Sequence, residues 1–148
     1  MKNDPQERRT LSSRLDLLRR RDFAWLLAGL LSAGIALLSL TPRPEQILHV
    51  RIWDKLGHFS AYGTLALAFA HALCRSGQRG LPLALIAILG SSAYGGAIEI
   101  LQGFFPPRTP DVMDALANAI GACLGAATFF AVSRGWALIR PAEARRAN

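Results

Sequence analysis

The chain has few cysteines and lacks the short motifs of several large enzyme classes. Its 148 residues include two cysteines, Cys74 and Cys123, too few for a disulfide framework or a cysteine metal site. The sequence contains no G-x-S-x-G nucleophile motif and no Walker-type phosphate loop. The usual signatures of serine hydrolases and of nucleotide-binding enzymes are therefore both missing, which weakens the case for an enzyme.

Charged residues are also scarce. They make up 18% of the chain, against about 25% in an average soluble domain, whereas 51% of the residues are hydrophobic. A helix needs about 20 mostly apolar residues to cross the hydrocarbon of a membrane. The sequence predicts an all-α, polytopic protein of the cytoplasmic membrane, a four-helix bundle whose spans are the four apolar runs Phe23–Leu40, Leu56–Cys74, Leu81–Leu101 and Val112–Ser133.

The basic residues are unevenly distributed along the chain. Of the 17 lysines and arginines, thirteen lie before Phe23, between the second and third runs, or after Ser133. Short cytoplasmic loops carry such an excess, so we expect both termini in the cytoplasm. Anionic membrane lipids then explain the net charge of +7 without a nucleic-acid partner.

This pattern divides the chain into three parts. We predict a basic cytoplasmic segment over residues 1–22, a membrane domain over 23–139 and a basic cytoplasmic tail over 140–148. The first apolar run is longer than the core of a usual signal peptide, and no A-x-A site follows it, so we expect an uncleaved anchor.

Polar and ionisable residues gather near the ends of three predicted spans. In the proposed topology all three ends lie at the outer face, so their side chains are expected to form one site. These residues are Asp54, Lys55, His58, Tyr62, Glu99, Gln102, Arg108, Asp111, Asp114 and Asn118.

The last predicted span carries its polar and small residues on one face. Asp114 and Asn118 are followed by Gly121 and Gly125, at spacings of four, three and four. At 100° per residue these positions share one side of a helix. The pattern predicts a polar outer half and an inner GxxxG seam that packs against another helix.

The charges of the site do not balance. With neutral histidine, four acids face two bases, which leaves a net charge of −2. A divalent cation, protonated carboxyls or a cationic ligand would relieve this imbalance. Asp54 and Asp111, together with His58 and Glu99, offer ligand types suited to a divalent cation, although their spacing matches no metal motif.

Structural roles remain open for several of these residues. Asp54 and Asp111 are placed to favour a helix dipole as first-turn acids, and Lys55 is long enough to reach lipid headgroups. Gln102 and Asn118 are suited to hydrogen bonds between helices.

Three segments resemble the VanZ-like family. They are DKLGHFSAY at 54–62, EILQGFF at 99–105 and RTPDVMDALANAIG at 108–121. Their order and spacing match the family, and the resemblance covers roughly residues 42–125. It implies a prokaryotic integral membrane protein whose polar positions are the ten residues named above. The family takes its name from an association with resistance to the glycopeptide teicoplanin, and the resemblance implies no particular reaction.

Two functions fit these observations. The first is a membrane enzyme that acts on an anionic or lipid-linked envelope component, with His58, Glu99 and Asp114 as catalytic groups. Its substrate would be bound by Lys55, Tyr62, Gln102, Arg108 and Asn118. The second is a non-catalytic binding or structural protein that modulates the envelope. Transport is least favoured, because no charged or amide residue of the last span lies deeper than Asn118.

Overall fold

The computed structural model describes residues 5–41, 54–105 and 111–139, and these residues form four helices. The described part contains no strand, so the all-α prediction is confirmed. The helices are α1 (Pro5–Leu40), α3 (Asp54–Arg75), α4 (Gly80–Gln102) and α5 (Val112–Ile139).

Three helices are long and apolar enough to cross a membrane. The qualifying segments are Arg20–Leu40 in α1, all of α4, and Val112–Gly135 in α5. Large apolar side chains cover the outside of these helices; Leu30 is 60% exposed and Leu89 63%. Exposed apolar surface on this scale marks contact with lipid or protein. The chain is therefore a multi-pass membrane protein.

α3 does not meet the same criterion, although the sequence predicts a span there. Two histidines, His58 and His71, together with hydroxyl and glycine residues, dilute its apolar run. Its 22 residues nevertheless make it almost as long as α4, which has 23.

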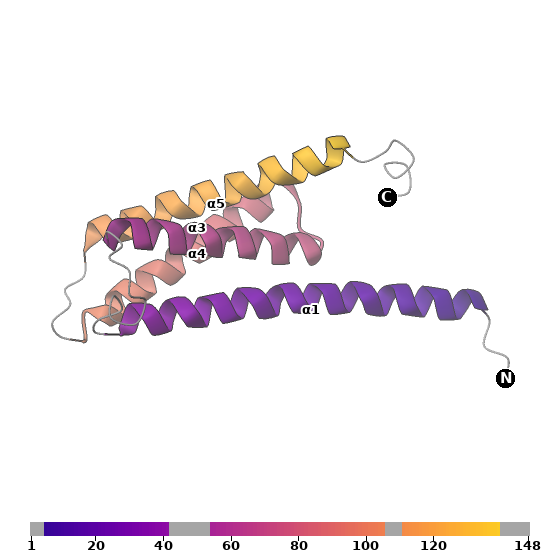
Figure 1. Ribbon diagram of the computed structural model, residues 1–148, viewed down its shortest axis with the longest axis horizontal. Coiled ribbons are helices and arrows are strands. Elements are labelled where there is room, and N and C mark those ends of the chain that lie inside the picture. The colour runs from indigo at the N-terminus through magenta and orange to yellow at the C-terminus, as the bar shows by residue number, and fades with distance from the viewer. Residues whose placement is uncertain (1–4, 42–53, 106–110, 140–148) are drawn as a thin grey trace.

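α1 runs alongside the other helices and extends past them at its N-terminal end (Figure 1). The Trp25 indole N–H donates to Ser76 Oγ at 2.9 Å, and near the opposite end of α1 Gln102 Nε2 donates to the Ser39 carbonyl at 2.7 Å. α1 is thus antiparallel to α3 and parallel to α4. Because α1 is continuous from Pro5, the predicted boundary between residues 22 and 23 falls inside a helix.

α3 and α5 lie side by side, point in the same direction and make the most extensive contact between helices (Figure 1). A Cβ atom added at Gly121 would overlap the backbone of Phe59, and one added at Gly125 would overlap the backbone of Gly63. Small residues of this kind let the backbones of membrane helices touch. The predicted GxxxG seam is therefore confirmed, with α3 as its partner.

The interior between the helices is rich in alanine. Ala66, Ala70, Ala87 and Ala122 are completely buried, whereas Tyr62 is the largest side chain that is almost completely buried. Small side chains bring the helices close, as is usual in membranes, where van der Waals packing drives helix association.

Candidate functional site

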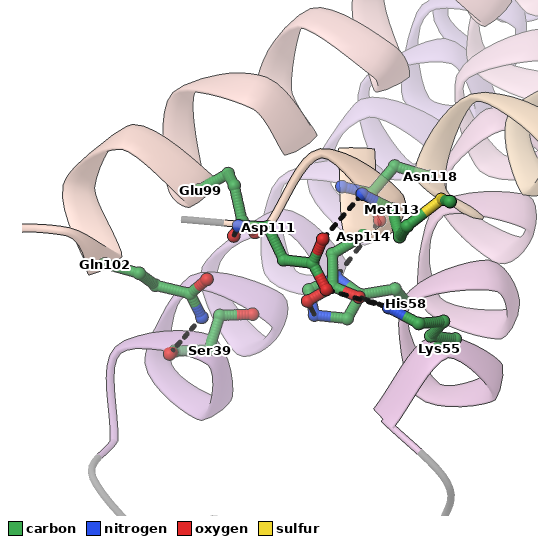
Figure 2. A network of polar contacts seen from close by, with 9 residues as sticks. All are labelled: Ser39, Lys55, His58, Glu99, Gln102, Asp111, Met113, Asp114 and Asn118. Atoms are coloured by element: carbon green, nitrogen blue, oxygen red, sulfur yellow. Dashed lines mark hydrogen bonds and ion pairs between the residues drawn. The ribbon is translucent and has the colours of Figure 1, made fainter. Parts of the chain in front are cut away.

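The start of α3, the end of α4 and the start of α5 meet at one end of the bundle (Figure 1). Lys55, in the first turn of α3, places its Nζ atom 2.9 Å from Asp111 Oδ2 and 3.1 Å from Asp114 Oδ1. One ammonium group therefore ties α3 to two carboxylates at the start of α5, as Figure 2 shows.

Asp111 connects all three helices. Its Oδ1 atom accepts the Met113 N–H at 2.8 Å, so Asp111 is the N-cap of α5 and lies just before its first turn. Its own backbone N–H donates to Glu99 Oε1 at 2.7 Å, which joins α5 to α4. The Lys55 ammonium and the Met113 N–H hold the pKa of the exposed Asp111 carboxyl below its usual range.

His58 lies one turn further along α3 and faces α5. Its Nδ1 atom is 3.1 Å from Asn118 Oδ1, and its Nε2 atom is 3.7 Å from Asp114 Oδ2. Since an amide oxygen only accepts hydrogen bonds, Nδ1 carries the proton in this contact. The ring also stacks on Tyr62, with 6.3 Å between centroids and 5° between planes. These contacts fix both the position and the orientation of the imidazole.

Several buried polar atoms of the cluster have no hydrogen-bond partner among the described residues. They are Glu99 Oε2, Asn118 Nδ2 and Tyr62 Oη. Glu99 is 6% exposed, and Asn118 and Tyr62 are each 1% exposed. Leaving a buried polar group unpaired costs about 1–3 kcal/mol, and more for a charged group. Structural packing alone does not explain why these atoms are retained.

Three of the ionisable side chains converge (Figure 2). One ligand atom from each of His58, Glu99 and Asp114 lies within 4.8 Å of the others, and all three side chains are largely buried. They come from three different helices, so the cluster exists only in the folded bundle.

The polar cluster lies in a part of the chain that is similar to a known protein family. A model of the VanZ/LLP1 family matches residues 19–133. The chain belongs to the VanZ/LLP1 family. No curated protein and no solved structure matches it significantly. The region that matches VanZ/LLP1 contains the whole polar cluster and omits most of the basic half of α1.

The structure brings together most of the residues that the sequence of this VanZ/LLP1 protein singles out. The exception among the described side chains is Gln102, which is directed to the Ser39 carbonyl of α1 (Figure 2). Arg108 and the side chain of Asp54 lie outside the described residues. The side chains that meet are Lys55, His58, Tyr62, Glu99, Asp111, Asp114 and Asn118.

The metal set expected from the sequence differs from the group that converges in this VanZ/LLP1 chain. Asp111 uses Oδ2 for Lys55 and Oδ1 for Met113, whereas Asp114 lies with His58 and Glu99. The helix spacing identified both aspartates but not how their roles divide.

Two positions of the VanZ/LLP1 site were not identified as such from the sequence. A Cβ atom at Gly95 would lie 2.7 Å from Asn118 Nδ2 and 2.9 Å from Tyr62 Cε1, so glycine there makes room for both side chains. Ser91, four residues earlier on α4, is fully buried, and its hydroxyl has no partner in the described part of the chain. Buried polar groups therefore continue inward on α4 beyond the level of Gly95.

Proposed function

We propose that this VanZ/LLP1 protein crosses the cytoplasmic membrane four times and binds an anionic, lipid-linked component of the cell envelope at its outer face. The packing of α3 supports the fourth span. Its backbone touches α5 at Gly63 and Gly125, well inside the membrane-spanning segment of α5. Backbone contact with a spanning helix at that depth supports a position of α3 within the membrane as well.

The orientation of the protein is supported by the distribution of basic residues. Reporter fusions at residues 1 and 148 should both report the cytoplasm, and a fusion after Phe105 should report the outer side. A C-terminus on the outer side would contradict this orientation and move the polar cluster to the cytoplasmic face.

The observation that carries the binding proposal is the buried Glu99–His58–Asp114 cluster with its unpaired polar atoms. A ligand that enters the cluster can supply the missing hydrogen bonds or charges. Lys55, whose side chain is 36% exposed, stands at the edge of the cluster and suits an anionic group.

The surroundings of the cluster favour a ligand with a lipid tail. Leu101 and Met113 are 44% and 56% exposed and lie at the end of α4 and the start of α5, the helix ends that meet at the cluster. A headgroup in the cluster would leave its hydrocarbon chain against this apolar surface. A water-soluble ligand would gain nothing from it.

The second candidate is a structural role without a ligand. Lys55 and Asp111 together tie α3, α4 and α5, an arrangement that would also serve only to hold the helix ends together. Removing one of the buried charged members, Glu99 or Asp114, would then destabilise the fold by about 3–5 kcal/mol. The two roles therefore differ in whether isosteric changes affect folding or function.

Complementation separates these roles. In a deletion strain with an envelope phenotype, Glu99→Gln, His58→Ala and Asp114→Asn should fail to complement while the folded protein stays at normal levels in the membrane. Teicoplanin sensitivity is one phenotype to measure, given the origin of the family name. Asp16→Asn, an exposed acid outside the cluster, is the matched control.

A second measurement follows the ligand directly. Native mass spectrometry of the full chain should detect a co-purified anionic lipid on the wild type and on Asp16→Asn, but not on Glu99→Gln. Full complementation by all three site variants at normal protein levels would sink the binding proposal. Loss of folded protein in all of them would favour the structural role.

A further inference from the structure

We propose that His58, Glu99 and Asp114 bind a divalent transition-metal ion, with zinc as the first ion to test. The proposal deepens the proposed function of the same site, because it names the cation through which an anionic headgroup would be held. It rests on four features of the cluster: the buried Glu99 Oε2 atom, the spacing of the ligand atoms, their chemical types and their charge.

Each of the three side chains has one polar atom fixed by a neighbour. Glu99 Oε1 accepts the Asp111 N–H at 2.7 Å, and Asp114 Oδ1 lies 3.1 Å from the Lys55 ammonium. His58 Nδ1 lies 3.1 Å from Asn118 Oδ1. Metal-binding histidines and carboxylates are held in this way, with an outer partner on the atom that does not bind the metal.

One atom from each of the three side chains makes up the candidate ligand set. Asp114 Oδ2 and His58 Nε2 lie 3.7 Å apart. Two ligands of one tetrahedral zinc ion lie about 3.4 Å apart, given bond lengths of about 2.1 Å. All three groups lie within 4.8 Å of one another, so small rotations of the Glu99 side chain bring the set onto one ion.

Glu99 provides the independent sign of a missing ligand. It is 6% exposed, and its Oε2 atom has no hydrogen-bond partner in the described part of the chain. An ionised carboxylate in such a place is costly unless a positive charge or a donor compensates it. Figure 2 shows that Glu99 reaches from α4 toward the same space as Asp114 and His58.

The chemistry of the set favours zinc or iron over calcium. One imidazole and two carboxylates resemble the donors of catalytic zinc sites, in which three protein ligands leave a further position open. Imidazole suits zinc and iron, whereas calcium takes oxygen ligands only. The open position is where an oxygen of a phosphate or carboxylate would bind.

The excess negative charge of the site also favours a bound metal ion. Among its described side chains, three carboxylates, Glu99, Asp111 and Asp114, face one ammonium group, that of Lys55. A site with excess negative charge repels an anionic headgroup. A dication would neutralise the two buried carboxylates and attract the anion, which reconciles the acidic residues with the proposed ligand.

Metal binding can be measured without knowing the lipid. The full-length chain, purified with a histidine-free tag and stripped with chelator, should bind one zinc ion per chain in isothermal titration calorimetry and show raised thermal stability. Glu99→Gln, Asp114→Asn and His58→Gln should each weaken binding by more than about 100-fold, the upper end of the loss typical for an outer partner.

Matched controls lie elsewhere in the same chain. His71→Gln and Asp16→Asn change an exposed histidine and an exposed aspartate outside the cluster, and both should bind zinc like the wild type. X-ray absorption of zinc-loaded wild-type protein provides a test that needs no variant. It should show one imidazole nitrogen and otherwise oxygen ligands.

Three results would overturn the metal site: no zinc bound by the wild type, undiminished binding by the three site variants, or two imidazoles on the ion. None of them would affect the lipid measurement on the same protein. Lipid that remains bound to chelator-treated protein would leave the proposed function standing and remove the metal. Zinc binding without any bound lipid would support the metal site and contradict the proposed lipid binding.

Discussion

The contact between α3 and α5 has two halves of opposite chemistry. In the deep half, Phe59 and Gly63 meet Gly121 and Gly125, and backbone touches backbone. In the outer half the space between the same helices holds charged and amide side chains, namely Lys55, His58, Asp111, Asp114 and Asn118.

The two halves affect stability in opposite ways. Close backbone packing stabilises a helix pair in lipid, where no hydrophobic force drives helices together. Buried polar groups with missing partners destabilise it. One pair of helices thus separates the two tasks along its length: the deep half fixes the geometry, and the outer half uses that geometry for the site.

The largest effect is expected in the deep half. Gly125→Leu would place a branched side chain where even a Cβ atom overlaps the backbone of Gly63. Forcing α3 and α5 apart should cost about 3 kcal/mol or more and remove most folded protein from the membrane. The matched control is Gly34→Leu in α1, where an added Cβ meets nothing within 4 Å. Equal amounts of folded protein for both variants, measured by fluorescence-detected size exclusion in detergent, would contradict this role for the seam.

A smaller effect is expected where the two halves join. Gly95→Ala would place its methyl group 2.7 Å from Asn118 Nδ2 and 2.9 Å from Tyr62 Cε1, so both side chains must shift. Gly96→Ala adds the same atom in open space and should gain up to about 1 kcal/mol of helix propensity. Thermal unfolding should therefore rank Gly96→Ala above the wild type and Gly95→Ala below Gly96→Ala. Gly95→Ala should also weaken ligand binding, and a pair of indistinguishable variants would show that Gly95 does not support the site.

The smallest effect concerns the exposed edge of the outer half. Lys55 and the Met113 N–H favour the ionised form of Asp111 in the folded chain, so its pKa is lower there than in the unfolded chain. The carboxylate therefore stabilises the fold above the ordinary aspartate pKa of about 3.9, and this contribution is lost as the pH falls through the lower, folded-state value.

Asp111→Asn isolates this contribution, because asparagine caps a helix as well as aspartate does. The melting temperature of the wild type should exceed that of Asp111→Asn by a small, constant amount above about pH 4 and converge with it below. A difference that stays the same at every pH would mean that the charge of Asp111 contributes nothing.

The sequence predicts those features that follow from the period of one helix. The spacing of Asp114, Asn118, Gly121 and Gly125 placed them on one face, and all four are buried. The span ends carrying Lys55, Glu99 and Asp114 were expected to meet, because alternating spans return the chain to the same side, and they do meet.

Features that depend on the fit between two helices were not predictable in this way. Gly63 matters because the backbone of α5 packs against it, and Gly95 because it leaves room for Asn118 and Tyr62. The spacing of residues within one helix does not reveal such contacts with another helix. The length of α1 shows a different limit. Its composition changes from basic to apolar near Phe23, but the helix continues across this change, so composition alone does not give the bounds of the helix.

The pairing of α3 with α5 also has a consequence for biosynthesis. His58 and Asn118 are 60 positions apart, and all of α4 is made between them. During translation α3, which is not apolar enough by itself to qualify as a membrane span, therefore leaves the ribosome well before its partner exists. Until α5 follows, Lys55 and His58 have none of their partners on that helix. In the proposed four-span arrangement, membrane integration of α3 is thus completed by α5, the last of the described helices to be synthesised, and a nascent chain that stops before α5 would leave α3 as a substrate for membrane quality control.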